Sequence, residues 1–196
     1  MNKLTIFGIT ALAFAMSACG GGSSTSSDSG TPNVGHNGSI DVANVALDGA
    51  ISCDVPQFAQ KLLAEINAVR AQPRNCGTHN FGPTASLGWN SMLADAAASH
   101  TMDMAAENYY SSTNPSGEVY SDRITDAGYK FSYAGEVLAL LSGDVTANNA
   151  IPRAMTAWLA DPGHCAALKS SVFDEVGASC VKVGKKAYFT VDLGGL

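Results

Sequence analysis

The cysteines of this chain, together with the segment that precedes them, set the strongest constraint on its fold. Residues 1–18, MNKLTIFGITALAFAMSA, contain an early lysine, an apolar run and small residues at the end. Such a segment is typical of an export signal and is too short to span a membrane stably. Because exported chains fold in an oxidising compartment, we expect the cysteines of the folded part to form disulfides.

Four cysteines lie in the part of the chain that we expect to fold: Cys53, Cys76, Cys165 and Cys180. Four cysteines allow three pairings. The local one, Cys53–Cys76 with Cys165–Cys180, would close two short loops and stabilise the fold by about 3 kcal/mol per bridge. A zinc site is disfavoured because the spacing is unsuitable and there is no CxxC motif. A catalytic Cys165 thiol is also disfavoured, because Cys180 is available as its partner.

The fifth cysteine, Cys19, ends the sequence MSAC, which resembles the lipobox of bacterial lipoproteins, with Met16 where that motif prefers leucine. The resemblance implies that Cys19 is acylated and becomes the first residue of the mature chain. The lipid would anchor the protein on the extracytoplasmic side of a membrane, and Gly20 is compatible with sorting to an outer membrane.

The residues after Cys19 are rich in glycine and serine and cannot bury enough apolar area to fold. We therefore expect three parts: a lipoprotein signal peptide over 1–18, a flexible tether over 19–50 and a folded domain over 51–196.

The composition is that of a folded, acidic protein. Of the 196 residues, 46% are hydrophobic and 14% are charged, and the formal net charge is −6. Because the chain has no basic block, we do not expect nucleic acid as a partner. An acidic protein also gains nothing from an anionic membrane surface, so acyl chains must supply the anchor.

Apolar spacing predicts helices first and a β-hairpin last. An apolar face with Phe58 and Leu62 predicts a helix over 55–72, capped by Asp54. The same pattern predicts a helix over 91–108 with His100 on its buried side, where a core residue is favoured over a ligand. Shorter helices are expected over 121–127 and 148–160, partial strand character over 131–141, and a hairpin over 178–194. This order predicts an α+β domain with helices on an antiparallel sheet.

The stretch WLADPGHC at 158–165 combines a helix start with reactive side chains. Asp161 is a good N-cap and Pro162 a good first helical residue. His164 lies at the positive end of that helix, which favours a neutral imidazole able to accept a proton or a metal. Glu136 lies in an apolar stretch, where a carboxylate needs a partner or its pKa rises. Glu136, Asp161 and His164 are thus a candidate cluster. The alternative is a helix cap, a solvated histidine and a hydrogen-bonded glutamate.

Eight segments in order resemble bacterial exported members of the CAP superfamily, which has the SCP or pathogenesis-related-1 type domain. The segments are INAVR (66–70), LGWNSMLADAAASHTMDMA (87–105), NYYSST (108–113), DRITDAGY (122–129), GEVLA (135–139), WLADPGHC (158–165), FDEVGASC (173–180) and YFTVDLG (188–194). Together they cover nearly all of residues 55–194. The resemblance implies a three-layer α-β-α sandwich, which agrees with the α+β pattern.

The resemblance also implies a central cleft with two histidines and two acidic residues. These positions fall on Ser112, Glu136, Asp161 and His164, so that a serine stands where the family has its first histidine. The family resemblance further implies a helix-to-strand disulfide between Cys165 and Cys180. With one imidazole, the set His164, Glu136 and Asp161 makes a weak divalent site. We therefore expect no cofactor, zinc included.

For function, the resemblance implies an exported binding or interaction module rather than a common reaction. We favour a non-catalytic module with a degenerate cleft that takes a lipid-like ligand or a protein partner of the cell envelope. The alternative is an envelope hydrolase or peptidase. There Glu136 would act as general base, His164 as acid or metal ligand, and Ser112 as a conceivable nucleophile. A purely structural surface role is a third alternative.

Overall fold

The computed structural model describes residues 37–196. The expected signal peptide, the expected lipidation residue Cys19 and most of the expected tether lie outside the described residues.

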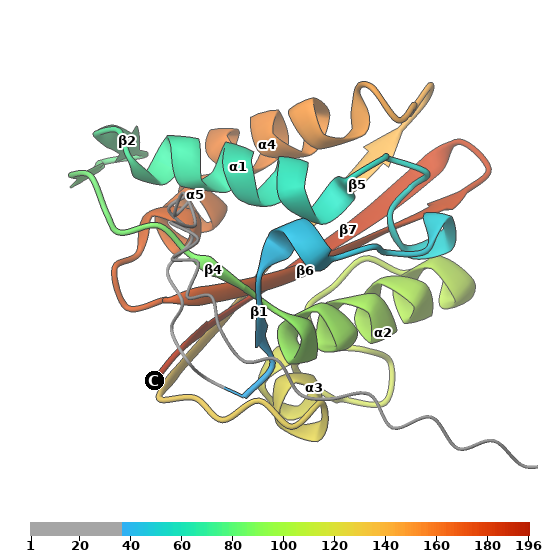
Figure 1. Ribbon diagram of the computed structural model, residues 1–196. Helices are drawn as coiled ribbons and strands as arrows, with labels where there is room; N and C mark the ends of the chain where they lie inside the picture. Colours follow the sequence, from blue (N-terminus) through green and yellow to red (C-terminus); the bar gives the residue numbers. More distant parts are fainter. Residues whose placement is uncertain (1–36) are drawn as a thin grey trace, which may run out of the picture.

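The described chain forms three layers, with a five-stranded sheet between two layers of helices (Figure 1). Helices α1 (Phe58–Arg70), α4 (Ala150–Ala160) and α5 (Pro162–Lys169) cover one face of the sheet. Helices α2 (Ser91–Glu107) and α3 (Tyr120–Asp126) cover the other. The expected α-β-α sandwich is thereby confirmed.

The sheet has a short strand at one edge and a long strand at the other. The order is β1 (Ser39–Ile40), β4 (Gly88–Asn90), β6 (Glu175–Val183), β7 (Lys186–Gly195) and β5 (Tyr133–Ser142). Strands β6 and β7 are the expected hairpin, but β4 pairs with β6 in parallel, so the sheet is mixed rather than antiparallel throughout. Strands β2 (Arg74–Cys76) and β3 (His79–Phe81) form a separate hairpin.

The two faces of the sheet differ in polarity. On β7 the odd-numbered residues, such as Phe189 and Val191, join the main core with α1 and α4, where the Phe189 ring meets Trp158 edge-on at 5.9 Å. Because side chains alternate along a strand, the even-numbered Thr190 and Asp192 project toward α2. This second face therefore carries buried polar groups.

Helix α2 lies unusually close to the sheet because β6 has a glycine beneath it. A Cβ added at Gly177 would lie 2.0 Å from the backbone nitrogen of Ala94. Small residues on α2, including Ala94 and Ala97, are buried at this contact. The close approach brings His100, further along α2, down onto the sheet.

The folded part begins earlier than the expected boundary at Ile51. Strand β1 pairs with β4 (Ser39 opposite Asn90), and Ser91 donates its N–H to the Gly38 carbonyl at 2.8 Å. Short 3-10 helices follow at Val42–Asn44 and Gly49–Ile51. Residues 39–50, the end of the expected tether, are therefore part of the domain.

The expected start of the first helix is also wrong. Helix α1 begins at Phe58 rather than at residue 55, and Asp54 does not cap it. Cys53, Asp54 and Gln57 all have φ between 52° and 57°. These left-handed conformations turn the chain sharply after its attachment to β6, so a helix cannot start until the turn is complete.

The disulfide pairing differs from both pairings that we expected. The bridges are Cys53–Cys180 and Cys76–Cys165, with Cα–Cα distances of 5.2 and 5.4 Å. The local pairing and the implied Cys165–Cys180 bridge are therefore wrong. The backbone of Ser52 pairs with that of Cys180 in an isolated parallel β-bridge, which places Cys53 beside β6. Cys165 on α5 faces the β2–β3 hairpin, which contains Cys76. The bridges span 127 and 89 residues, and the loop-entropy relation gives about 5 kcal/mol for each.

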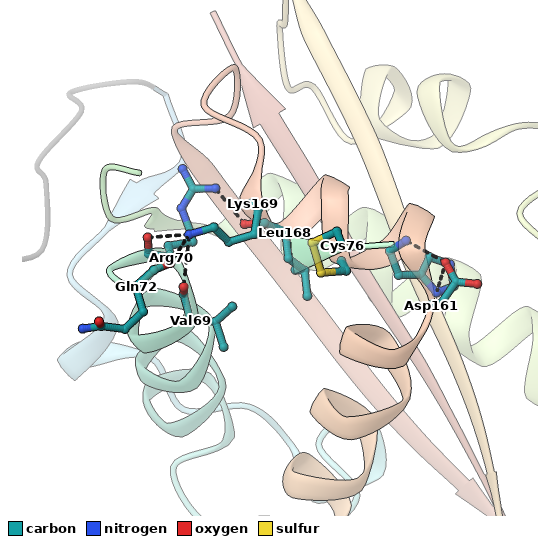
Figure 2. The surroundings of a disulfide bond; sticks show 9 residues. Val69, Arg70, Gln72, Cys76, Asp161, Leu168 and Lys169 are labelled. Carbon is teal, nitrogen blue, oxygen red and sulfur yellow. Dashed lines mark hydrogen bonds and ion pairs between the residues drawn. A yellow bond between two sulfur atoms is a disulfide. The ribbon is translucent and has the colours of Figure 1, made fainter. Parts of the chain in front are cut away.

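Two buried cations, one at the end of α1 and one at the end of α5, each donate to the C-terminal carbonyls of the other helix (Figure 2). Lys169, the last residue of α5, donates from Nζ to the carbonyls of Val69, Arg70 and Gln72 at 2.6–3.2 Å. Arg70, the last residue of α1, donates from Nη1 to the carbonyls of Leu168 and Ser170 at 2.9 and 2.8 Å. Burial lowers the pKa of both groups. Because helix C-termini attract cations, this exchange fixes α5 against α1.

Replacing Lys169 by methionine should lower the free energy of unfolding by about 3 kcal/mol, because three carbonyl groups lose a charged donor and the Gln72 carbonyl has no other donor among the described residues. The matched control is Lys182→Met on the exposed part of β6, for which we expect a change within about 0.5 kcal/mol. Urea denaturation measures both. Equal stability of the two variants would mean that the reciprocal caps contribute nothing.

Candidate functional site

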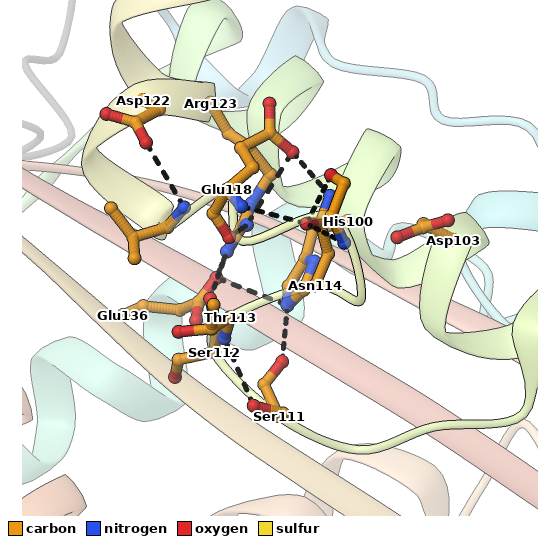
Figure 3. Close-up of polar contacts among 12 residues, drawn as sticks. His100, Asp103, Ser111, Ser112, Thr113, Asn114, Glu118, Asp122, Arg123 and Glu136 are labelled. Atoms are coloured by element: carbon orange, nitrogen blue, oxygen red, sulfur yellow. Dashed lines mark hydrogen bonds and ion pairs between the residues drawn. The ribbon is translucent and has the colours of Figure 1, made fainter.

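A buried ion pair forms the centre of the candidate site (Figure 3). Arg123 on α3 donates from Nη2 to Oε2 of Glu136 on β5 at 2.8 Å, and the two side chains are 4% and 1% exposed. The same guanidinium donates to the carbonyls of Ser112 and Glu118 at 2.9 and 3.2 Å. Burial raises the pKa of Glu136, while the neighbouring Arg123 acts in the opposite direction. The pair thus joins β5, α3 and the loop between α2 and α3.

His100 is buried beside this pair in its neutral form. Its Nε2 lies 2.9 Å from the Ser111 carbonyl, which can only accept, so Nε2 carries the proton. Burial, with the charge of Arg123, lowers the pKa of His100 to about 4. The same Nε2 lies 3.8 Å from Oε2 of Glu136. The expectation of a satisfied core histidine is confirmed, although its closeness to Glu136 was not anticipated.

The serine at the family's histidine position lies beside Glu136. The Ser112 carbonyl accepts from Nη2 of Arg123 at 2.9 Å, and the same nitrogen donates to Oε2 of Glu136 at 2.8 Å. Asn114 shapes this loop, because its Oδ1 accepts from the backbone N–H groups of Ser116 and Glu118. Ser112 is thus held next to Glu136, whereas no hydrogen bond within residues 37–196 joins it to His164.

Asp161 and His164 form a second, more exposed pair at the start of α5. Oδ1 of Asp161 accepts from the His164 backbone N–H at 2.8 Å, which confirms the expected N-cap and lowers the pKa of Asp161. His164 Nδ1 lies 3.8 Å from the same oxygen, and the side chains are 31% and 53% exposed. Within residues 37–196, no hydrogen bond or ion pair joins Glu136 to either residue.

Tyr110 connects the two pairs electrostatically. Its hydroxyl donates to the Leu138 carbonyl on β5 at 3.0 Å, and the side chain is 46% exposed. Burial raises the pKa of Tyr110, and the charges of Asp161 and Glu136 add to that rise. The partly exposed tyrosine therefore feels the charges of both Asp161 and Glu136.

The residues expected to hold a metal do not come together as a ligand set. Among residues 37–196, no group of three or more His, Cys, Asp or Glu side chains is arranged to hold a metal ion. Glu136 is bound to Arg123 instead, which leaves Asp161 and His164 as a pair. Since a structural or catalytic zinc site needs at least three protein ligands, the residues present do not fit zinc.

Four important residues were missed in the sequence: Arg123, Tyr109, Tyr110 and Asp192. A glutamate within an apolar strand signals a buried cation, but nothing in the sequence identifies Arg123 as that cation. Tyr109 donates its hydroxyl to Asp103 beside His100, which no pattern indicated. Asp192 could have been found, because alternation in YFTVDLG places it on the same face as Thr190.

Removing only the cation of the ion pair should destabilise the fold more than removing both charges. Arg123→Met should lower the free energy of unfolding by about 3–5 kcal/mol, because Glu136 remains buried without its partner. The double variant Arg123→Met/Glu136→Leu should recover much of that loss. Urea denaturation measures the series, with Arg153→Met as control, since Arg153 bonds only to surface carbonyls of Ser142 and Asp144. A double variant no more stable than Arg123→Met would contradict the pairing.

None of the helices in residues 37–196 is long and apolar enough to cross a membrane.

Comparisons with known proteins agree with this fold. The model of the cysteine-rich secretory protein family, CAP, matches residues 63–193. The membrane protein YlbC of Bacillus subtilis (strain 168) is 32% identical over 104 residues, which are 53% of this chain and 28% of YlbC. The chain therefore spans little more than a quarter of that relative.

Two solved structures resemble the fold at low identity. An extracellular protein with an SCP domain from Bacillus anthracis str. Ames superposes with a TM-score of 0.56 at 23% identity, over 70% of this chain and 40% of that one. An outer surface protein of Borrelia burgdorferi superposes with a TM-score of 0.55 at 22% identity, over 69% and 90%. Since the family model matches well over half of the chain, this protein belongs to the CAP, or cysteine-rich secretory protein, family.

Proposed function

We propose that this chain is an exported, membrane-tethered CAP-domain protein that acts as a binding module rather than as an enzyme. The observation that carries the proposal is the buried Arg123–Glu136 ion pair. In this pair Arg123 binds the Glu136 carboxylate, which a hydrolytic mechanism would require as its general base.

A general base must reach the proton that it removes and must be able to hold it. Glu136 is almost wholly buried, and its Oε2 accepts from Arg123. The nearest imidazole, His100, has a pKa lowered to about 4 and donates to a carbonyl. Neither group is suited to accept a proton from a substrate near neutral pH.

Ser112 likewise lacks the environment of an activated nucleophile. An activated serine needs a base in hydrogen-bonding reach that can take its proton. The carboxylate beside Ser112 is that of Glu136, whose Oε2 already accepts from Arg123 at 2.8 Å, and the partly exposed imidazole of His164 lies beside Asp161. The hydrolase alternative therefore receives no support from these contacts.

The exposed rim of Tyr110, Asp161 and His164 is the part of the cleft that a partner can reach. Tyrosine is enriched at protein interfaces because it offers both an apolar ring and a hydroxyl. The neighbouring carboxylate and imidazole add polar contacts. This mixture favours an envelope protein as partner over a lipid-like ligand.

The membrane tether is part of the same proposal. Acylation at Cys19 would leave 20 residues before Ser39, which can reach at most about 70 Å. Strand β1 begins the described sheet at one edge, whereas Glu136 lies on β5 at the opposite edge. The rim would thus face away from the point where the tether joins the domain.

Replacing Cys19 by serine should move the protein from the membrane fraction to the soluble exported fraction, because the acyl chains supply the anchor. Fractionation followed by immunoblotting measures the change, with Ser23→Ala as a control that keeps the cysteine. Continued membrane association of the Cys19→Ser protein would exclude this anchor.

A photo-reactive amino acid in place of Tyr110 should cross-link the full chain to a discrete envelope component in intact cells. The same probe in place of Tyr133, a tyrosine of similar exposure at the start of β5, is the matched control and should not. The adduct should disappear when Asp161→Ala and His164→Ala are added.

Three results would contradict the binding proposal. One is turnover of peptide or ester reporters that is lost in both Ser112→Ala and His164→Ala. Another is saturable zinc binding in calorimetry that His164→Ala removes. The third is equal cross-linking from positions 110 and 133.

A further inference from the structure

Asp192 is a buried carboxyl group for which the proposed function gives no role. It lies on β7, fully buried, and neither of its carboxyl oxygens has a hydrogen-bond partner among the described residues. The strand register sets it directly opposite Glu136 on β5. Because facing residues of paired strands project to the same side, both carboxyl groups lie on the α2-facing side of the sheet.

The hydrogen-bond pattern brings these two residues especially close. Gly143 donates its N–H to the Lys185 carbonyl, so odd-numbered positions of β5 exchange hydrogen bonds with β7. The outward-facing Leu138 carbonyl, which accepts from Tyr110, agrees with this alternation. Glu136 and Asp192 are therefore a non-hydrogen-bonded pair, in which the Cα atoms are about 4.5 Å apart rather than about 5.5 Å.

One cation faces these two carboxyl groups. Helix α3 contributes Arg123, which binds Oε2 of Glu136. Helix α2 contributes His100, which is neutral. On β6 the residue opposite Asp192 is Gly177, which carries no charge. Two carboxylates with one guanidinium would leave a net negative charge in the interior, which is costly.

The remaining titratable groups nearby are engaged elsewhere. Glu175 on β6 accepts from the Tyr129 hydroxyl at 2.9 Å and from Asn90 at 3.2 Å. In the loop between α2 and α3, Tyr109 donates to Asp103 and Tyr110 donates to Leu138. Glu118, at the end of that loop, accepts from Asn114 at 2.8 Å and lies 3.9 Å from Arg123. No second cation therefore balances Asp192 within the described part of the chain.

One bound proton would neutralise the excess negative charge, and the contacts indicate which carboxyl group holds it. Glu136 has the guanidinium and remains ionised, while Asp192 has no such partner. Burial raises the pKa of Asp192 well above its usual range, and the charge of Glu136 adds to this against the effect of Arg123. Oε1 of Glu136 is buried without a donor and can accept from a protonated carboxyl group.

We propose that Asp192 and Glu136 form a proton-binding site beneath the cleft. The Asp192 carboxyl group keeps one proton at neutral pH and donates it in a hydrogen bond to Oε1 of Glu136. Asp192, Glu136 and Arg123 together then have no net charge. The proton allows two facing carboxyl groups to remain in the interior with one counter-ion.

Unfolding of the full chain by urea between about pH 4 and pH 9 tests this site. The folded protein keeps a proton that the unfolded chain releases, so rising pH favours unfolding up to the raised pKa. The ratio of the wild-type unfolding constant to that of Asp192→Asn should therefore rise by up to about tenfold per pH unit over that interval. The control is Ser179→Ala, which removes a buried hydroxyl bonded to the Ile51 carbonyl and should give a ratio independent of pH.

Infrared spectroscopy of the same proteins keeps the test decisive if Asp192→Asn does not fold. The wild type should show the carbonyl stretch of a protonated carboxyl group at neutral pH. In Glu136→Gln this band should vanish, because Asp192 then becomes the anion that Arg123 pairs with. A wild type without the band, a pH-independent ratio for Asp192→Asn, or a band that persists in Glu136→Gln would each overturn the proposal.

Discussion

The ion pair between Arg123 and Glu136 is the interaction on which the arrangement of the cleft depends. Burying two charges costs more free energy in lost hydration than their attraction usually regains. The role of such a pair is therefore to fix the positions of the segments that it joins rather than to stabilise the fold. Here the guanidinium binds an edge strand, a short helix and two carbonyls of the connecting loop at once. Helix α3 has only seven residues, too few to be stable as an isolated helix. The common contact of these three segments with one planar cation fixes where the loop passes β5.

The other half of the cleft is positioned by different means. Helix α5 is also short, with eight residues, yet it is held at both ends. Its first turn is capped by Asp161 and bridged through Cys165 to the β2–β3 hairpin, and its last residue, Lys169, reaches into the C-terminus of α1. The Glu136 charge is thus paired with Arg123 inside the protein, whereas Asp161 and His164 are open to solvent on a firmly attached helix.

Some of this arrangement was accessible from the sequence and some was not. Local patterns were sufficient for the cap at Asp161, the hairpin of β6 and β7 and the buried side of α2, because each depends on residues close in the chain. The disulfides were not predicted correctly, because Cys53 and Cys180 meet only after β6 has taken its place in the sheet. The left-handed turn at Cys53 and Asp54, which displaced the start of α1, follows from the same long-range contact.

In the candidate site, too, the sequence indicates some features, and others depend on contacts between distant segments. Family resemblance identified Ser112, Glu136, Asp161 and His164 by position, but the chemistry of Glu136 is set by residues on three other segments. His100 comes close to it because Gly177 lets α2 approach the sheet, Arg123 because α3 packs over β5, and Asp192 because of the β5–β7 register. None of these three contacts has a local sequence signal. A carboxylate that the sequence offers as a candidate base is therefore turned by its surroundings into part of a closed, neutral cluster. What remains for recognition lies at the rim, on Tyr110 and the first turn of α5.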